Sequence, residues 1–207
     1  MYSDIVRDMP KLYPPFVRKE LQGKYIVTEE IDPDYLWVFE NEHVLATEKM
    51  DGTCVSIVLE GGQIASIWNR TNRVPLLGKE KYYISEGILA SYRKGYIDML
   101  TDGQWFGELI GEKLQGNPYK ITGHLWIPFR TYTQEHLAYK SFHKYPKNYE
   151  SLSRWFKDDL FSLLYRRRTG VVSPAEGIVF VHPDGRMCKL RRDMFDWYKG
   201  KNHKEVI

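Results

Sequence analysis

Residues 48–53 read Glu-Lys-Met-Asp-Gly-Thr and lie between two apolar stretches, His43 to Lys49 and Cys54 to Glu60. Both stretches have the composition of strands, and Asp-Gly is a strong signal for the tight turn that joins two strands. We therefore expect Lys49 at the end of a strand, beside a turn, in an antiparallel sheet. Such a lysine is either an exposed charge beside a turn or a nucleophile, and a nucleophile needs surroundings that take its proton.

Hairpins are predicted outward from this turn. Val55, Ile57 and Leu59 alternate with other residues and give the second strand one apolar face. Gly61-Gly62 is a turn signal, after which Gln63 to Arg70 returns as a third strand. Four more strands are predicted, the last two joined by a Pro-Asp-Gly turn: Gln104 to Ile110, Leu125 to Tyr132, Glu176 to His182 and Met187 to Arg191.

Three helices complete the expected fold. The segment Lys79 to Leu100 repeats apolar residues every four positions, and Ser151 to Arg168 is amphipathic. Asp193 to Lys199 is expected to be a short last helix, whereas the proline-containing residues 1–23 predict an irregular arm or a short helix. Together these elements predict one α+β domain over residues 1–207, with antiparallel sheet and flanking helices.

The composition is that of an ordinary globular protein, with 43% hydrophobic and 28% charged residues. The net charge of +3 does not by itself indicate a nucleic-acid-binding protein. Cys54 and Cys188 lie in apolar runs, so we expect buried free thiols in a reducing compartment. No apolar run approaches the roughly 20 residues of a membrane span, and Met1 to Glu20 lacks the apolar centre of a signal peptide. We therefore expect a cytoplasmic protein.

Six short motifs follow one another between about residues 43 and 192 of the chain. They are Glu48-Lys49-Met50-Asp51-Gly52, Asn69-Arg70-Thr71-Asn72, Phe106-Gly107-Glu108-Leu109-Ile110-Gly111, the aromatic run Trp126 to Phe129, Ala175-Glu176-Gly177-Ile178-Val179-Phe180 and Lys189-Leu190-Arg191. In this order they resemble the lysine nucleotidyltransferases: ATP-dependent DNA ligases, RNA ligases and mRNA-capping guanylyltransferases. The RNA ligase 2 group is the most similar. The resemblance implies an antiparallel-sheet nucleotidyltransferase with an ATP-grasp-like ligase core.

The resemblance implies that Lys49 attacks the α-phosphorus of ATP, expels pyrophosphate and carries AMP through a phosphoramidate bond. Family members use the backbone at the position of Glu48 to bind the adenine edge. Asp51 is expected to orient Lys49 or the water around a metal ion, or simply to form the turn before Gly52. Arg70 matches the arginine that contacts the ribose, for which a rigid guanidinium is suited; the alternative is a solvated arginine at a strand end.

Three further positions are expected at the nucleotide. Glu108, in the run Gly107 to Gly111, is costly to bury without a partner such as a metal ion, a lysine or a ribose, and flanking glycines would let backbone approach a ligand. Phe129 is the first candidate for stacking on the base and Trp126 the second, with core packing as the alternative for each. Gln115 matches a glutamine of the RNA ligase 2 group.

The last predicted hairpin carries the candidates for phosphate binding. Glu176 is the best candidate ligand for Mg²⁺ or Mn²⁺, with Asp51 as a second. Lys189 and Arg191 alternate along one strand and therefore share a face. Beside Lys49 they are expected to be catalytic, holding the α-phosphate and stabilising the leaving pyrophosphate. The family usually has Lys-x-Lys here, whereas this chain has Arg191 at the second position.

These motifs predict an ATP-dependent RNA ligase, a monomer that acts on RNA or an RNA-containing nicked duplex. The alternatives are a minimal DNA ligase, an adenylyltransferase domain that depends on a partner, a non-catalytic nucleotide- or nucleic-acid-binding module and a GTP-using enzyme. Because only residues 192–207 follow the last motif, we expect neither an OB-fold nor a C-terminal helical domain. Arg166 to Arg168, Lys140, Lys144 and Lys147 either follow a phosphate backbone or are solvated, and the histidines lack metal-site spacing.

Overall fold

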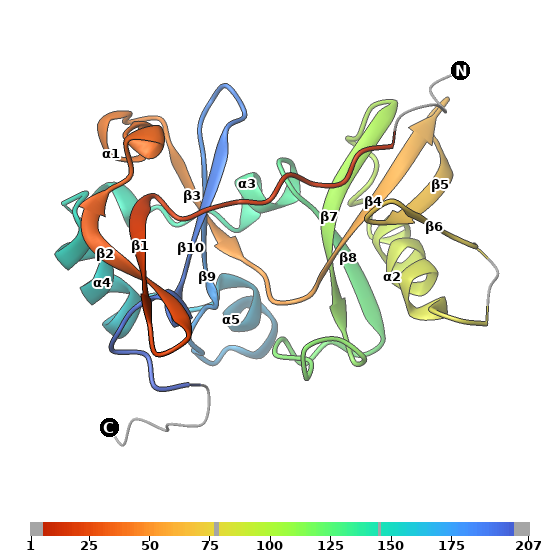
Figure 1. The fold of residues 1–207 in the computed structure, drawn as a ribbon. Helices are drawn as coiled ribbons and strands as arrows, with labels where there is room; N and C mark the ends of the chain where they lie inside the picture. The colour runs from red at the N-terminus through yellow and green to blue at the C-terminus, as the bar shows by residue number, and fades with distance from the viewer. Residues whose placement is uncertain (1–5, 77–78, 145, 201–207) are drawn as a thin grey trace. The chain divides into compact units, whose positions relative to one another are not determined.

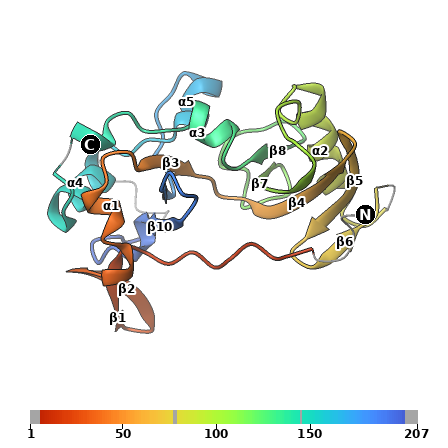
Figure 2. The same ribbon diagram turned by 90° about the horizontal axis from the view of Figure 1, so that it is seen from above.

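The computed structural model describes residues 6–76, 79–144 and 146–200, and it combines antiparallel sheets with helices, as predicted (Figure 1 and Figure 2). The strands are β1 (Phe16–Leu21), β2 (Lys24–Ile31), β3 (Leu45–Lys49), β4 (Thr53–Glu60), β5 (Gln63–Asn69), β6 (Asn72–Val74), β7 (Gly103–Gly111), β8 (His124–Pro128), β9 (Gly177–Val181) and β10 (Met187–Arg191). The α-helices are α1 (Trp37–Glu40), α2 (Tyr82–Arg93), α3 (Tyr132–His136), α4 (Tyr149–Asp158) and α5 (Leu163–Thr169). Short 3-10 helices are η1 (Pro33–Tyr35), η2 (Phe142–Lys144) and η3 (Arg192–Met194).

The contacts within the chain divide it into two compact units. Unit 1 comprises Met1–Lys11, Met50–Leu137 and Arg167–Thr169, and unit 2 comprises Leu12–Lys49, Ala138–Arg166 and Gly170–Ile207. The chain therefore passes from unit 2 to unit 1 directly after Lys49. Each unit has its own sheet and its own hydrophobic core. The organisation of residues 1–207 as one functional domain stays a prediction.

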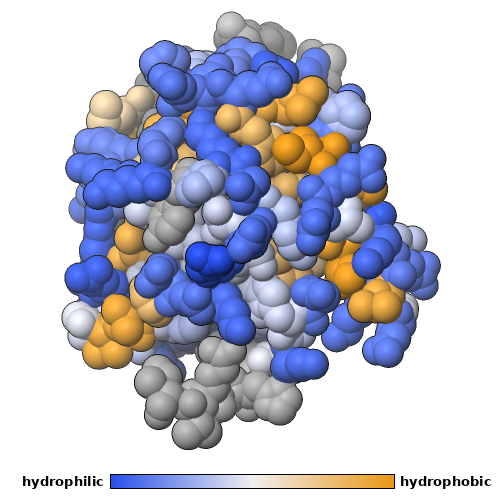
Figure 3. Space-filling model, turned by 90° about the vertical axis from the view of Figure 1, so that its left-hand side faces the viewer, coloured by the Kyte–Doolittle hydropathy of each residue, from blue (hydrophilic) through white to orange (hydrophobic). Residues whose placement is uncertain are grey.

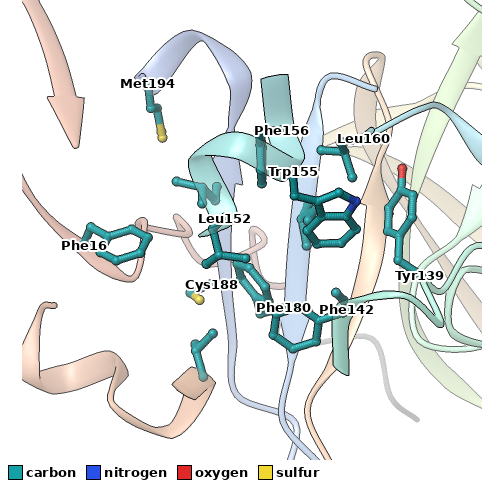
Figure 4. Packing of buried hydrophobic residues seen from close by; sticks show 14 of the residues in the cluster. Phe16, Tyr139, Phe142, Leu152, Trp155, Phe156, Leu160, Phe180, Cys188 and Met194 are labelled. Carbon is teal, nitrogen blue, oxygen red and sulfur yellow. The ribbon is translucent and has the colours of Figure 1, made fainter. Parts of the chain in front are cut away.

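Unit 2 is built on a three-stranded antiparallel sheet in the order β10-β9-β3. Alternate residues of this sheet, such as Ile178, Phe180 and Leu190, face a core that they form with α1 and α4 and are fully buried. Figure 4 shows the aromatic part of this core, where Trp155 and Phe156 of α4 lie beside the strands. The opposite face carries Lys49, Lys189 and Arg191 together with apolar residues such as Val179, so these three candidate site residues point away from the core.

A second element of unit 2 is the β1–β2 hairpin. Residues 6–15 contain no helix or strand, in agreement with the predicted irregular arm, whereas residues 16–23 form β1 and the hairpin turn, which corrects the prediction there; residues 1–5 lie outside the described residues. The hairpin turn is Gln22-Gly23, in which both residues have positive φ angles of 51° and 78°. Phe16 and Val27 are buried, whereas most of the outward residues of β1 are charged. Figure 3 shows the left-hand face of Figure 1, on which hydrophilic side chains predominate with smaller apolar patches, the ordinary mixture for a protein surface.

The predicted helix Ser151 to Arg168 is two helices, α4 and α5. Between them the chain runs extended, and Phe161 forms a β-bridge with Pro174 while the amide of Ser162 donates to Ser173 O at 2.7 Å. Ser162 then caps α5, its side chain accepting from the amide of Tyr165 at 3.0 Å. The predicted helix was wrong because apolar residues continue at helical spacing across a break that tertiary contacts impose.

Unit 1 is built on a five-stranded antiparallel sheet in the order β6-β5-β4-β7-β8, with α2 packed on β8. The approach of α2 to the sheet depends on Gly87, because a Cβ there would lie 2.3 Å from Leu109 Cδ1. Helix α2 is shorter than predicted and ends before Gly95, which has a φ of 74°. The strand predicted over Leu125 to Tyr132 ends at Pro128, and the helix predicted over residues 193–199 is only the 3-10 turn η3.

Candidate active site

Lys49 and Glu176 form an ion pair at one end of the unit 2 sheet. Lys49 is the last residue of β3 and lies opposite Gly177, the first residue of β9, so Glu176 immediately precedes the paired position. Lys49 Nζ donates to Glu176 Oε2 at 2.8 Å. Their side chains are only 20% and 19% exposed. The predicted nucleophile therefore has a carboxylate within proton-transfer distance.

The sheet register brings the two cations of β10 to the same face as Lys49. Gly177 pairs with both Lys49 and Arg191, and Val179, two residues further along β9, pairs with Lys189. Directly paired residues of an antiparallel sheet share a face, with neighbouring strands about 4.8 Å apart, so Lys49 and Arg191 project from strands about 10 Å apart. The structure thus agrees with the predicted alternation and places Glu176 at the same end of the sheet.

Gly177 leaves the position between Lys49 and Arg191 without a side chain. A Cβ there would lie 2.2 Å from Leu190 O and 2.8 Å from Arg191 Cα, so the strands approach too closely for any other residue. Arg191 Nε lies 3.1 Å from Asp193 Oδ1, within ion-pair distance but without the geometry of a hydrogen bond. Arg191 is thus oriented by a carboxylate of its own segment.

Glu48 faces the core, on the opposite side of the sheet from Lys49, and is 2% exposed. Its carboxylate accepts hydrogen bonds from Ser162 Oγ at 2.5 Å and from the Leu164 amide at 2.9 Å. Both donors belong to the first turn of α5, where a negative charge also interacts favourably with the helix dipole. The side chain of Glu48 therefore stabilises the fold, so a contact of this residue with adenine would have to come from its backbone.

We expect Glu48→Ala to lower the free energy of unfolding by about 2–3 kcal/mol, because it removes a charged acceptor from two buried donors. Urea denaturation measures the effect. The matched control is Asn148→Ala, which removes the N-cap of α4, where the side chain accepts from Ser151 N at 2.9 Å; a cap of this kind contributes about 1 kcal/mol. A loss no larger than that of Asn148→Ala would contradict the role of Glu48.

Arg192 supports the segment that holds Glu176, a role that was not predicted from the sequence. Its amide donates to Glu176 O at 2.9 Å, and its guanidinium donates to Ala175 O at 3.2 Å and to Leu160 O at 3.0 Å. An arginine fork is suited to tying two backbone segments together. These contacts join segments more than thirty positions apart in the chain. The one sequence signal for Arg192 is its position directly after the Lys189-Leu190-Arg191 motif.

Arg70 and Glu108 lie in unit 1. Arg70 was predicted as the last residue of a strand, but β5 ends one residue earlier, at Asn69. Arg70 is exposed in the turn between β5 and β6 and has a left-handed backbone with φ of 56°. Glu108 is 9% exposed on β7, an inner strand that lies between β4 and β8, opposite Cys54 of β4 and Ile127 of β8. The two residues are thus held by the same sheet, one in a turn and the other on an inner strand.

The glycines beside Glu108 serve packing within the protein, which corrects the prediction that they admit a ligand. A Cβ on Gly107 would lie 2.5 Å from Trp126 Cε2, so the indole fills the space above this glycine. Trp126 itself is fully buried, and its Nε1 donates to Val55 O at 3.0 Å. Trp126 is therefore a core residue, which corrects its prediction as a stacking residue. Phe129, directly after β8, is only partly buried and remains the candidate.

The turn that follows Lys49 is fastened within unit 1. The amide of Asp51 donates to Tyr119 Oη at 2.8 Å, and Gln115 Nε2 lies 3.4 Å from Gly52 O. Tyr119 is 4% exposed. Asp51 lies in a bend just after β3, but β3 and β4 belong to different sheets, so Asp51-Gly52 is not a tight turn between paired strands, which corrects that prediction. Gln115 contacts the motif, and Tyr119 is a contact residue that the sequence did not reveal.

The carboxylates fit a metal ion that arrives with phosphate oxygens. Within the described residues, no group of three or more His, Cys, Asp or Glu side chains is arranged to hold a metal ion. Mg²⁺ is commonly bound by one or two carboxylates together with water and substrate phosphates, so Glu176 suits this kind of site. His124 is buried and engaged by Glu86 at 2.6 Å and by the Lys113 amide at 3.2 Å, in agreement with a structural role.

Other predicted features are distributed as follows. Cys188 is buried, which raises its thiol pKa, whereas Cys54 is only partly buried; both are free thiols. Two of the predicted basic residues contact backbone: Lys147 Nζ donates to Asn41 O at 2.9 Å and Arg168 Nε to Tyr119 O at 3.3 Å.

A hollow of about 650 Å³ lies against α4. It is lined by Glu29 and by residues of α4 and its N-cap, and it does not include the ion pair of Lys49. Among the helices of the described residues, none has the length and apolar composition needed to cross a bilayer.

Comparison with known families decides which class of protein carries this arrangement. The family model described as RNA ligase matches residues 42–199, a range that extends from just before β3 to beyond β10. The chain belongs to the RNA ligase family. The match includes Lys49, Glu176, Lys189 and Arg191, and it confirms the resemblance inferred from the order of the motifs.

Solved structures similar to this RNA ligase family member include those of a Naegleria gruberi RNA ligase. A glutamate-to-alanine variant of that protein with ATP and Mn has 16% sequence identity and a TM-score of 0.50, and the match covers 87% of this chain and 59% of that one. A lysine-to-methionine variant with AMP and Mn has 16% identity and a TM-score of 0.49, covering 92% and 59%. The chain thus spans about 59% of the length of these relatives. At 16% sequence identity, this similarity shows a shared fold only. No curated protein matches the chain significantly.

Proposed function

We propose that this chain is an ATP-dependent RNA ligase that forms a covalent lysyl-AMP at Lys49. The observation that carries the proposal is the 2.8 Å contact between Lys49 Nζ and Glu176 Oε2, on a sheet face shared with Lys189 and Arg191. Membership of the RNA ligase family supports it. An ordinary surface lysine is exposed to solvent, whereas the side chain of Lys49 is only 20% exposed and lies beside the carboxylate of Glu176. Lys189 and Arg191 add two positive charges on the same face of the sheet.

The first step follows from this geometry. Lys49 Nζ forms a bond to the α-phosphorus of ATP, and the bond from that phosphorus to the bridging oxygen breaks, so pyrophosphate leaves with the electron pair. The amine can attack only after its ammonium form has lost a proton. Glu176 Oε2, at 2.8 Å, is placed to accept that proton, which makes Glu176 both the partner of the resting lysine and its base.

Lys189 and Arg191 are the proposed phosphate ligands. Both project from β10 on the face of Lys49, so their positive charges face the phosphates of a nucleotide attached there. Such fixed charges stabilise the negative charge that develops on the leaving pyrophosphate. Arg191 differs from the lysine usual in the family, and its permanently charged, planar guanidinium is suited to holding two phosphate oxygens rather than to giving up a proton.

Two further transfers complete the reaction. The 5′-phosphate of an RNA strand attacks the α-phosphorus of the lysyl-AMP, a diphosphate bridge forms and the amine of Lys49 is released. The 3′-hydroxyl of the second strand then attacks the activated 5′-phosphorus, the phosphodiester forms and AMP leaves. Splitting the reaction through a covalent intermediate preserves the energy of ATP until the nucleic acid is bound.

A divalent metal ion is part of the proposal. Glu176 would hold Mg²⁺ or Mn²⁺ together with phosphate oxygens, and Asp51 is a second candidate ligand or orients the water around the ion. When bound, the ion screens phosphate charge. The Naegleria gruberi relative of TM-score 0.50 contains ATP and Mn, in support of this choice.

For the residues that contact the nucleoside, we propose the roles that the resemblance to the family implies. Arg70 contacts the ribose, Glu108 binds a ribose or cationic partner, Phe129 stacks on the base and the backbone of Glu48 binds the adenine edge. Phe129 is supported by its partial exposure. Arg70 is supported by its position in an exposed turn, where a left-handed backbone that costs a non-glycine residue about 1 kcal/mol is retained.

A strand-joining assay tests the proposal. The protein, ATP and Mg²⁺ are incubated with nicked duplexes whose 3′-OH ends are RNA or DNA, each with a 5′-phosphate. We expect joining of the RNA-ended nick, and less joining when GTP replaces ATP. Equal or better joining of the all-DNA nick would favour a DNA ligase, GTP preference would favour capping-type chemistry, and binding without joining or covalent AMP would indicate a non-catalytic module.

A further inference from the structure

Side chains of residues 112–121, here called the clamp loop, hold the backbone of the turn that follows Lys49. The Asp51 amide donates to the phenol oxygen of Tyr119 at 2.8 Å, and Gln115 Nε2 lies 3.4 Å from Gly52 O. Tyr119 is 4% exposed, so its hydroxyl is delivered from a buried ring. The contact joins positions 68 residues apart and depends on one hydroxyl group.

The clamp loop is itself unusually constrained. Gln115, Asn117 and Lys120 all have left-handed backbones, with φ angles of 49°, 51° and 53°. Asn117 bridges the loop, its side chain donating to Ile121 O at 2.8 Å and accepting from Ile121 N at 2.9 Å. Left-handed non-glycine residues persist where surrounding contacts over-determine them, and they concentrate at functional sites.

Two more contacts fix the loop and the turn in unit 1. Arg168 Nε donates to Tyr119 O at 3.3 Å and its Nη2 to Lys120 O at 3.2 Å, so a guanidinium holds the backbone on which the tyrosine is mounted. Gly52 is pressed against β7, where a Cβ would lie 2.2 Å from Leu109 O. The turn therefore has little freedom to move away from Tyr119.

We propose that Tyr119 is a positioning residue for the lysine nucleophile. This inference rests on the proposed adenylylation of Lys49. On its N-terminal side Lys49 is fixed by the pairing of β3 with β9. On its C-terminal side the Asp51 amide, two residues on, is held by Tyr119. Because reaction rates depend steeply on the approach geometry of the nucleophile, loss of this anchor slows the attack without removing a group that touches ATP.

The test compares Tyr119→Phe with Tyr139→Phe. Tyr139 is a matched control, 7% exposed, whose hydroxyl donates to Phe161 O at 3.0 Å in unit 2. Single-turnover formation of protein-bound AMP from ATP labelled at the α-phosphate is measured over a range of ATP concentrations. Thermal midpoints and the hydrogen exchange of the Asp51 amide are measured on the same proteins.

For Tyr119→Phe we expect a maximal rate about tenfold lower, which corresponds to the loss of one hydrogen bond, with a half-saturating ATP concentration within about twofold of wild type. The Asp51 amide should exchange faster. For Tyr139→Phe we expect a similar shift in thermal midpoint, because one hydrogen bond of a buried tyrosine hydroxyl is lost there too. Its rate should stay within about twofold of wild type, because the Tyr139 hydroxyl bonds to Phe161 O and not to the turn after Lys49.

Three results would overturn the inference. The first is a Tyr119→Phe rate equal to wild type, and the second is equal slowing in both variants, which would indicate general destabilisation. The third is wild-type protein that forms no covalent AMP, which would refute both the proposed function and the positioning role. The first two results would refute the positioning role alone and leave the proposed function intact. The exchange of the Asp51 amide reports separately whether the hydrogen bond exists.

Discussion

Lys49→Arg is expected to abolish covalent AMP formation, with a fall of at least about a thousandfold, the scale seen when a covalent nucleophile is removed from an enzyme. The guanidinium keeps the positive charge opposite Glu176 but stays protonated at any accessible pH, so it has no lone pair with which to attack phosphorus. The fold should survive, because the ion pair with Glu176 can still form. Label from α-labelled ATP and the thermal midpoint are the two measurements.

Lys147→Arg is the control for this change. Lys147 is another partly buried lysine of unit 2, and its Nζ donates to Asn41 O at 2.9 Å; burial lowers its pKa. We expect this variant to form AMP-protein at the wild-type rate. Residual labelling of Lys49→Arg at more than a few per cent of wild type would show that another residue carries the nucleotide.

Glu176→Gln is expected to lower the rate of AMP-protein formation by about a hundredfold or more, the usual contribution of a positioned base. The amide is nearly the same size, but it neither accepts a proton from the Lys49 ammonium nor carries the charge that a divalent ion needs. The rate is measured with saturating ATP at several Mg²⁺ concentrations.

Glu150→Gln provides the matched control, since Glu150 pairs with Arg154 at 2.9 Å on an exposed face of α4. Exposed pairs of this kind contribute little to stability, so neither its rate nor its fold should change noticeably. A Glu176→Gln rate within about threefold of wild type would remove Glu176 from the chemistry, whatever its effect on stability.

Period-two patterns explain why most of the sheet could be predicted from the sequence. Val55, Ile57 and Leu59 lie in the unit 1 core as their alternation predicts, although Ser56 and Val58 between them are also buried. Lys189 and Arg191 flank the buried Leu190. The turn residues Asp-Gly and Gly-Gly marked where strands end. Strand pairing between β3 and β9 brings Lys49 and Glu176 together, and the resemblance to a known family, rather than any local pattern, is what joined them in the prediction.

The parts that could not be predicted depend on tertiary contacts. The β1–β2 hairpin was missed because its outward residues are charged and its apolar side is short. The break between α4 and α5 was missed because the carboxylate that holds the start of α5 belongs to Glu48, more than a hundred residues earlier. An aromatic residue on a strand gives no sign of its depth, so Trp126 and Phe129 could not be separated without the structure.

The identity of the residue that carries AMP tests the account most directly. The wild-type protein is incubated with Mg²⁺ and ATP labelled at the α-phosphate or at the γ-phosphate, then denatured, digested and mapped by mass spectrometry. The account predicts protein-bound label from the α-labelled nucleotide alone, on the peptide that contains Lys49, as an acid-labile phosphoramidate. Absence of label, label from the γ-phosphate or label on any other residue would contradict it.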